Sequence, residues 1–410
     1  MKKIVVPVLS ILSILSIPST ILPAEDANPN ATLEDFESIT GWEKQNGAQV
    51  EAAEPVSVGK GAVKFSGPGL AFKKVKNVKS LKPDSLNDGY EGISFWVKGD
   101  GSDMYGTIVL CGQHPLWMPF KYSYSFPLKD TEWKKITVPW DKFVPEDAVY
   151  PIGTPGGMPP SGFQNIKLGN KWNIYHNNKP MPKFSFCIDQ IQFEEKVPSD
   201  KNTPKLKSFV EVLKLLKDKK PVSILCLGDS ITAGTSLKSP DTERYAQVLE
   251  KLLRKEYGYD QITVVSKAVG GAQGNDLRLW LDRDFTGTPP DLVTIMYGYN
   301  DKTWGYSKEY FTYSLNDYLD RIARKTNGAS AVLLISTIPG KNERFFMMDD
   351  YANCIRAIAK DRGLALCDAA KEFKSFGRDG IDAYMADQAH PNAKGHEVMA
   401  NAIAGVLSGK

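Results

Sequence analysis

The chain has few cysteines and, beyond its first residues, no long hydrophobic run. Five cysteines in 410 residues are too few, and odd in number, for a fold built on disulfide bonds. The 51 basic and 48 acidic residues nearly balance, and no sustained basic run provides the surface expected for nucleic-acid binding. No HExxH motif, P-loop or GxGxxG after a strand occurs, so we expect no cofactor and no catalytic metal. The length predicts two domains.

The first residues predict export. Lys2 and Lys3 precede an apolar run, residues 4–17, and the next residues lead to Ala24. This order of charged, hydrophobic and small-residue regions is typical of a secretory signal peptide. The apolar run is shorter than the roughly 20 residues that span a bilayer, and an uncleaved membrane anchor is the alternative. We expect residues 1–24 to be a signal peptide, and the mature protein to be secreted or periplasmic and free of the membrane.

Three of the cysteines fall in segments where a buried thiol is expected. Cys226 and Cys367 lie in apolar strand-like runs and Cys354 in a helical one, where cysteine acts as a small hydrophobic residue. Cys111 and Cys187 both belong to the first half of the chain. The sequence leaves open whether these two form a disulfide bond.

Residues 31–196 predict an antiparallel β-sandwich. Short alternating runs are separated by turn sequences, with no long helical pattern between them. Six of the eight tryptophans lie here, and their rings suit either the core or stacking on sugar rings. The clearest runs are 93–97, 107–111, 135–138 and 184–193.

Four segments of this region resemble the jelly-roll superfamily of carbohydrate-binding modules, notably its galactose-binding-like members. The resemblance implies a β-sandwich and makes glycan binding plausible, but it identifies no binding residue. The segments are 33–37, 95–101, 133–140 and 187–193.

From residue 197 the character of the chain changes. Residues 197–220 separate the two domains: the polar stretch 197–204 holds two prolines and predicts a linker, and the amphipathic helix predicted over 205–219 should pack on one of the domains. Residues 221–410 alternate strand-like and helical runs, which predicts a parallel sheet of about five strands with helices on both faces. Strands are expected at 223–227, 261–265, 292–296, 331–336 and 365–367, and the longer helices at 242–257, 308–324, 351–362 and 394–406.

The sequence around Ser230 marks the end of the first of these strands. A buried run stops at Gly228 and Asp229, and Ser230 follows close to the start of a helix. Open α/β sheets bind their ligands at this end of a strand, where a helix N-terminus also favours negative charge. A turn that merely caps a helix is the alternative, because Asp and Ser are common N-caps.

Partners for this serine lie farther along the chain. A serine hydroxyl needs a base, a group that orients the base, and donors for an oxyanion. Only four histidines exist, and His390 follows Asp387 by three residues, a spacing at which the carboxylate can reach one imidazole nitrogen. Glycines at 270–271 and the segment 298–301 follow the next two strands and offer hydrogen-bond donors.

Over residues 221–408 the chain resembles the SGNH (GDSL-like) hydrolases, whose four blocks occur in order at 228–232, around Gly271, at 298–301 and at 387–391. The resemblance implies that Ser230 is the nucleophile, His390 the base, and Asp387 the group that orients it. It also implies an oxyanion hole formed by the Ser230 and Gly271 N–H groups and the Asn300 amide.

The chain departs from the family pattern at one point. Ser266 stands where many members carry Asn. Because Gly270 is adjacent to Gly271, the sequence does not decide which of the two glycines supplies the N–H group of the oxyanion hole. We expect Asp229 and Asp301 to hold their turns by hydrogen bonds.

These features predict an esterase that removes O-acetyl or similar short acyl groups from a polysaccharide. Three aromatic residues near Asn300 are candidates for substrate binding, with ordinary packing as the alternative: Tyr299, Trp304 and Tyr306. Other enzymatic alternatives are a peptidoglycan O-acetyl esterase and a lipase or thioesterase. A non-catalytic glycan-binding protein is the alternative from a different class.

Overall fold

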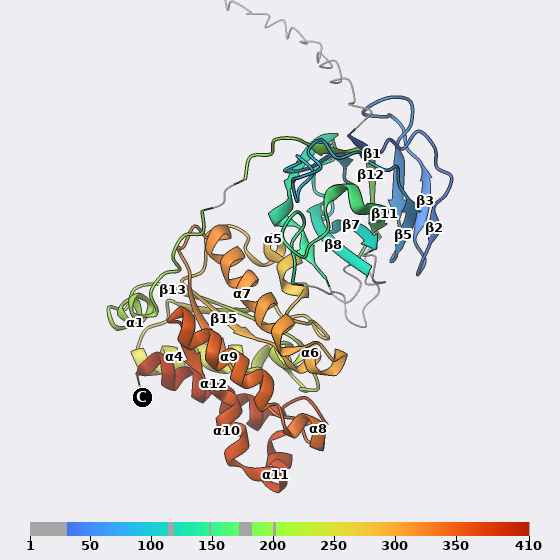
Figure 1. Ribbon diagram of the computed structural model, residues 1–410. Coiled ribbons are helices and arrows are strands. Elements are labelled where there is room, and N and C mark those ends of the chain that lie inside the picture. Colours follow the sequence, from blue (N-terminus) through green and yellow to red (C-terminus); the bar gives the residue numbers. More distant parts are fainter. Residues whose placement is uncertain (1–30, 114–118, 147–148, 172–182, 200–201, 410) are drawn as a thin grey trace, which may run out of the picture.

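The computed structural model describes residues 31–113, 119–146, 149–171, 183–199 and 202–409 (Figure 1). The predicted signal peptide lies outside these ranges, as do Trp117 and Trp172. Two units follow one another along the chain, an antiparallel β unit and an α/β unit. Among the described residues, no helix is both long and apolar enough to cross a membrane.

Two six-stranded antiparallel sheets make up the β unit. The first has the order β3-β4-β12-β6-β9, with β1 also paired to β12, and the second has the order β10-β8-β7-β11-β5-β2. The strands of the first sheet are β1 (Thr32–Glu34), β3 (Gln49–Ala52), β4 (Val63–Ser66), β6 (Gly92–Lys98), β9 (Lys134–Pro139) and β12 (Ser185–Glu194). Those of the second are β2 (Glu43–Lys44), β5 (Leu70–Lys74), β7 (Tyr105–Gln113), β8 (Pro119–Pro127), β10 (Val144–Pro145) and β11 (Phe163–Gly169), and short 3-10 helices occur at Trp140–Lys142 and Pro160–Gly162.

One aromatic core joins the two sheets. Phe126 of β8 contacts Phe95 of β6 and Phe186 of β12, with ring centroids 5.4 and 5.3 Å apart. Trp42 packs on this core and Trp140 is buried in it, so these two rings serve packing. The predicted sandwich of antiparallel sheets is therefore present, whereas its jelly-roll connectivity stays a prediction.

The cysteines of the β unit are not linked. Cys111 lies on β7 and Cys187 on β12, in different sheets, and both thiols are free. Burial raises the pKa of Cys111 to about 11, which keeps its thiol protonated.

The amphipathic helix before the second unit is shorter than predicted. Helix α1 spans Phe209–Lys217, because Ser208 adopts an extended conformation and caps it. The Ser208 side chain accepts from the N–H of Val210, and Glu211 accepts in turn from the N–H of Ser208. The preceding residues run as an extended chain whose Lys207 N–H reaches the carbonyl of Ser330.

The α/β unit contains the predicted five-stranded parallel sheet, with the order β14-β13-β15-β16-β17. The connection from β13 leads to β14 on one side of it, and the later strands are added on the other side. A topological switch point therefore lies between the carboxyl ends of β13 and β15. With right-handed crossovers, α4 and α12 pack together on one face and α7 and α9 on the other (Figure 1). The strands are β13 (Val222–Gly228), β14 (Ile262–Ser266), β15 (Leu292–Met296), β16 (Ala331–Ile335) and β17 (Ala365–Cys367).

The helices of this unit include several short ones that the sequence did not predict. The segment predicted as one helix over 242–257 is two, α3 and α4, because Arg244 between them is extended and the Tyr245 N–H binds His396 Nδ1. The helices are α2 (Ser230–Ala233), α3 (Pro240–Glu243), α4 (Tyr245–Tyr257), α5 (Leu281–Asp284), α6 (Tyr299–Trp304), α7 (Lys308–Lys325), α8 (Glu343–Phe346), α9 (Asp349–Arg362), α10 (Ala369–Ser375), α11 (Gly377–Gly380) and α12 (Ala393–Ser408), with 3-10 helices η4 (Asp276–Leu279) and η5 (Ile381–Tyr384).

The two units meet along α7 and the segment that follows β9. Arg321 of α7 donates to the carbonyls of residues 141, 142 and 143, at distances of 2.9 to 3.1 Å. Tyr310, at the start of α7, donates its hydroxyl hydrogen to the carbonyls of Pro145 and Glu146. Side chains of the second unit therefore bind the main chain of the first.

Candidate active site

Ser230 lies where β13 ends and α2 begins, at the switch point of the sheet. Asp229 caps this short helix, since its Oδ1 accepts from the N–H of Ile231 at 2.9 Å. A side chain at Gly228 would lie 1.9 Å from Thr232 Oγ1, so the tight turn requires glycine there. The Gly-Asp-Ser sequence is thus a helix cap, and it also places Ser230 at the carboxyl edge of the sheet.

A chain of hydrogen bonds runs from Ser230 through His390 to Asp387. His390 Nε2 lies 2.9 Å from Ser230 Oγ, and His390 Nδ1 lies 3.0 and 2.9 Å from the two carboxylate oxygens of Asp387. An ionised carboxylate only accepts hydrogen bonds, so the imidazole proton belongs on Nδ1 and Nε2 is left to accept the serine proton. The arrangement can remove a proton from Ser230.

The turn before α12 holds Asp387 in place. The N–H groups of Ala389 and His390 each donate to Asp387 Oδ1 at 2.8 Å. The carbonyl of His390 accepts from the N–H of Ala386 and closes the turn. A three-residue spacing therefore brings both the backbone and the imidazole of His390 onto the same carboxylate.

Ser236 also binds Asp387, a contact that no motif in the sequence indicates. Its Oγ donates to Asp387 Oδ2 at 2.6 Å from the turn that follows α2. Ser236 has a φ of +71°, a conformation unfavourable for a residue with a side chain. Burial alone would raise the pKa of Asp387, but the hydrogen bonds from Ser236, Ala389 and His390 outweigh it and hold that pKa well below its usual range.

Asn300 ties the Gly271 loop to the serine turn. Its Nδ2 atom, on α6, donates to the carbonyl of Ala272 at 3.0 Å and to Asp229 Oδ2 at 3.3 Å. Gly271 itself has a φ of +78°, and a side chain there would meet no atom within 4 Å. Its backbone conformation, rather than lack of space, therefore favours glycine. The hydrogen bonds of Asn300 thus reach the residues next in sequence to Ser230 and Gly271, the other two predicted members of the oxyanion hole.

Two buried aspartates brace these turns, as expected from the sequence. Asp229 bonds to Ile231 and Asn300, and both oxygens of Asp301 accept from the N–H of Gly274 at 3.0 and 3.1 Å. Burial raises the pKa of Asp229 to about 7, and burial also raises that of Asp301 to about 7. Ser266, where the chain departs from the family pattern, donates to the carbonyl of Thr232 at 3.4 Å.

The three predicted substrate-binding aromatics have different surroundings. Tyr299 is buried and stacks on Phe345 with ring centroids 4.6 Å apart, which is a packing role. Tyr306 contacts the ring of Tyr310 at 4.9 Å, and its carbonyl accepts from the hydroxyl of Tyr351. Trp304 is 69% exposed, so its ring is available to a ligand.

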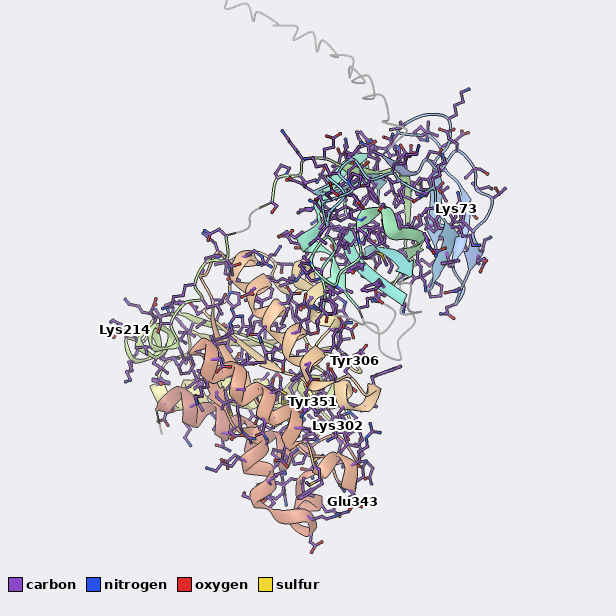
Figure 2. All side chains as sticks on the ribbon, viewed as in Figure 1. Lys73, Lys214, Lys302, Tyr306, Glu343 and Tyr351 are labelled. Carbon is purple, nitrogen blue, oxygen red and sulfur yellow. The ribbon has the colours of Figure 1, made fainter. Side chains whose placement is uncertain are left out.

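Contacts with α9 fix the short helix α6 that carries Asn300. Lys302 donates to Asp350 at 3.2 Å and lies 6.0 Å from the ring centroid of Tyr351. Figure 2 shows Lys302, Tyr306 and Tyr351 close together on this side of the α/β unit. Asn300 is therefore held by packed helices as well as by its own hydrogen bonds.

The described residues contain no group of three or more His, Cys, Asp or Glu side chains that could hold a metal ion. His396, the other described histidine, is fully buried and accepts from the N–H of Tyr245 at 3.1 Å. Burial lowers its pKa to about 4, so it stays neutral and serves the packing of α4 on α12. His114 and His176 lie outside the described residues.

Comparisons with known proteins concern the second unit. Residues 226–398 match the model of the GDSL-like Lipase/Acylhydrolase family. An acetylxylan esterase of Geobacillus stearothermophilus is 29% identical over 202 residues, which are 44% of this chain and 91% of that protein.

Solved structures of similar proteins cover the same share of the chain. The acetylxylan esterase Axe2 of Geobacillus stearothermophilus is 22% identical with a TM-score of 0.40, and covers 46% of this chain and 95% of its own. LAE5, an α/β hydrolase enzyme from the metagenome of Lake Arreo, Spain, is 24% identical with a TM-score of 0.39, and covers 45% and 94%. Over residues 226–398, the C-terminal part of this chain is therefore similar to the GDSL-like lipase/acylhydrolase family.

Proposed function

We propose that the protein is an exported serine esterase that removes O-acetyl or similar short acyl groups from a polysaccharide. The observation that carries the proposal is the hydrogen-bonded chain from Ser230 Oγ through His390 to Asp387, with distances of 2.9 to 3.0 Å. Such a chain activates a serine for attack on an ester carbonyl. Its position at the switch point of the sheet is where α/β proteins bind small ligands.

The reaction follows from these contacts. Ser230 Oγ attacks the ester carbonyl while His390 Nε2 takes its proton, and Asp387 stabilises the imidazolium that forms. The bond between the acyl carbon and the sugar oxygen then breaks, His390 gives its proton to that oxygen, and the acyl group stays on Ser230. A water molecule, deprotonated by His390, attacks this acyl group and releases the acid, and the serine regains its proton.

The negative charge of each tetrahedral intermediate falls beside three donors. Ser230 occupies the first helical position of α2, where its N–H has no acceptor within the helix. The second donor is the N–H of Gly271 and the third is the Asn300 amide. Of the two hydrogen bonds that Asn300 Nδ2 makes, the one to Asp229 is longer, 3.3 against 3.0 Å, and is the bond that is exchanged for the oxyanion.

A carbohydrate ester fits the surroundings of this site better than a long-chain ester does. The relative from Geobacillus stearothermophilus that is 29% identical over 202 residues is an acetylxylan esterase. Trp304, four residues after Asn300, offers an exposed ring of the kind that stacks on the apolar face of a sugar. The β-sandwich unit and the predicted signal peptide suit an extracellular or periplasmic polysaccharide.

Release of acetate by the wild-type and Ser230→Ala proteins tests the proposal. The substrates are acetylated xylan, other acetylated polysaccharides, O-acetylated peptidoglycan, and p-nitrophenyl esters of short and long acids. We expect release from an acetylated polysaccharide and from the short ester, and almost none with Ser230→Ala. Ser375→Ala is the matched control, because Ser375 is an exposed serine on α10 whose hydroxyl donates to the carbonyl of Glu372.

The outcomes separate the alternatives. Serine-dependent release only from long-chain esters would favour a lipase, and release only from peptidoglycan would change the substrate. Failure of an organophosphonate to label Ser230 would mean a non-catalytic protein. N-terminal sequencing of the exported protein, with a start near residue 25 expected, tests the signal peptide.

A further inference from the structure

The loop that carries Gly271, residues 270–278, is held from three directions. On one side the carbonyl of Ala272 binds Asn300, and the N–H of Gly274 binds Asp301. Within the loop, Asp276 accepts from the N–H of Gln273 at 3.1 Å. On the third side the loop faces the β unit, and Arg278 makes the contact with it.

Arg278 joins the loop to both α7 and the β unit through one guanidinium group. Its Nη2 atom donates to Asn275 Oδ1 at 2.5 Å and to the carbonyl of Pro145 on β10 at 2.9 Å. Its Nη1 atom donates to Asp317 Oδ2 of α7 at 3.0 Å. The side chain is fully buried, and its charge is balanced by Asp317.

We propose that Arg278 is a positioning residue through which the β unit holds the Gly271 loop, so that the β unit is a structural component of the oxyanion site. The inference rests on the proposed function, because it assigns the loop a part in stabilising the oxyanion. A guanidinium suits this task because its rigid fork can bind the loop, the helix and the β unit at the same time. A lysine ammonium also carries three N–H donors, but they share one nitrogen and cannot reach acceptors that lie along the two sides of a planar fork.

Charged groups of the β unit also act on the same loop. Asp276 is half-buried, and the ion-paired side chains of Lys171 and Glu146, both from the β unit, exert Coulombic effects on its carboxylate. Burial raises the pKa of Asp276, and the Lys171 ammonium opposes that change. Tyr310 binds the carbonyls of Pro145 and Glu146 next to the contact of Arg278. The end of the β unit near Pro145 is therefore bound both by Arg278 of the loop and by the start of α7.

Arg321 provides a matched control. Like Arg278, it is a buried arginine that binds Asp317 and donates to main-chain carbonyls of the β unit. It makes no contact with residues 270–278 among its hydrogen bonds. Replacing Arg321 therefore weakens the junction between the units and leaves the loop contact intact.

The experiment compares Arg278→Gln and Arg321→Gln with the wild type in kcat and KM for p-nitrophenyl acetate. Because the oxyanion forms only after the substrate has bound, in the tetrahedral intermediates and the transition states that lead to them, a displaced donor lowers kcat and leaves KM within about twofold. We expect Arg278→Gln to lower kcat at least about tenfold, up to the ~10²-fold expected for loss of one donor. Both variants should lose thermal stability, but Arg321→Gln should keep its kcat within about twofold.

A second pair of variants covers the case in which Arg278→Gln does not fold. Asn275→Ala removes the side-chain acceptor of the loop, and it leaves the bond from Arg278 to Pro145 and the longer one, 3.5 Å, to the backbone carbonyl of residue 275. Asn275→Asp keeps an acceptor oxygen beside the guanidinium. We expect kcat to fall with Asn275→Ala and to be restored with Asn275→Asp, a rescue that a purely structural loss would not show.

The results overturn the inference in a defined way. Equal kcat values for Arg278→Gln and Arg321→Gln, or a wild-type kcat for Asn275→Ala, would mean that the loop does not depend on this contact. Absence of Ser230-dependent hydrolysis in the wild-type protein would instead refute the proposed function. The two failures are therefore distinguishable.

Discussion

Removing the hydroxyl of Ser236 should shift the acidic limb of the pH–rate profile to higher pH. The Ser236 Oγ donates to Asp387 Oδ2 at 2.6 Å and draws negative charge away from the His390 side. Without this donor the carboxylate attracts the imidazolium proton more strongly. The base is then lost by protonation at a higher pH than in the wild type.

The size of the shift follows from the exposure of the carboxylate. A hydrogen bond to a charged group contributes about 1.5–3 kcal/mol. The Asp387 side chain is 42% exposed, so water replaces part of the lost bond, and only the remainder acts on the imidazolium. If about a third of this hydrogen-bond free energy, roughly 0.7 kcal/mol, acts on the imidazolium, the midpoint of the acidic limb moves by about 0.5 pH unit.

The assay is kcat/KM for p-nitrophenyl acetate between about pH 5 and pH 8, the range in which a histidine base titrates. Ser236→Gly is the cleaner variant, since glycine adopts the φ of +71° without strain, and Ser236→Ala shows what strain adds. An acidic limb that stays in place, or that moves to lower pH, would refute the reasoning. A uniform fall in rate without a shift would mean that Ser236 only fixes the position of Asp387.

Three further predictions concern neighbouring residues. Asp387→Ala should leave measurable kcat where Ser230→Ala leaves almost none, because Asp387 forms no covalent bond; equal and complete loss in folded variants would give Asp387 a larger role. Asn300→Ala should lower kcat about 10²-fold with little change in KM, and an unchanged kcat would exclude its amide from the oxyanion hole. Burial raises the pKa of Asp301 from 3.8 to about 7, so ionisation of this residue in the unfolded chain lowers the stability of the fold as the pH rises from about 4 toward 7. By calorimetry, Asp301→Asn should show a smaller fall in Tm over that range than the wild type does. An equal fall in the two proteins would contradict this account.

The parallel sheet could be predicted because its strands are short buried runs with clear ends. The predicted ranges 292–296 and 365–367 agree with β15 and β17 at both ends. The short helix α6 was missed, since six residues hold too few turns for a helical period to show. Arg244 interrupts a segment with helical periodicity, because an acceptor 151 residues away binds the next N–H.

The core of the candidate site was predictable for a different reason. Ser230, Asn300 and His390 each lie where a strand ends or a helix begins, so a parallel sheet brings them to one edge. Ser236 and Arg278 carry no such marker. Their partners, Asp387 and Pro145, are 151 and 133 residues distant, and only the folded chain brings them into contact.

At the junction between the two units, side chains of the α/β unit bind main-chain carbonyl groups of the β unit. Arg278 and Arg321 donate to carbonyl oxygens of residues 141–145, and every amino acid supplies a carbonyl oxygen. Substitutions in this segment that keep its backbone conformation therefore preserve the acceptors. The outer surface of a β unit attached in this way can diverge in sequence, or the unit can be replaced by grafting, without redesign of the α/β side of the junction.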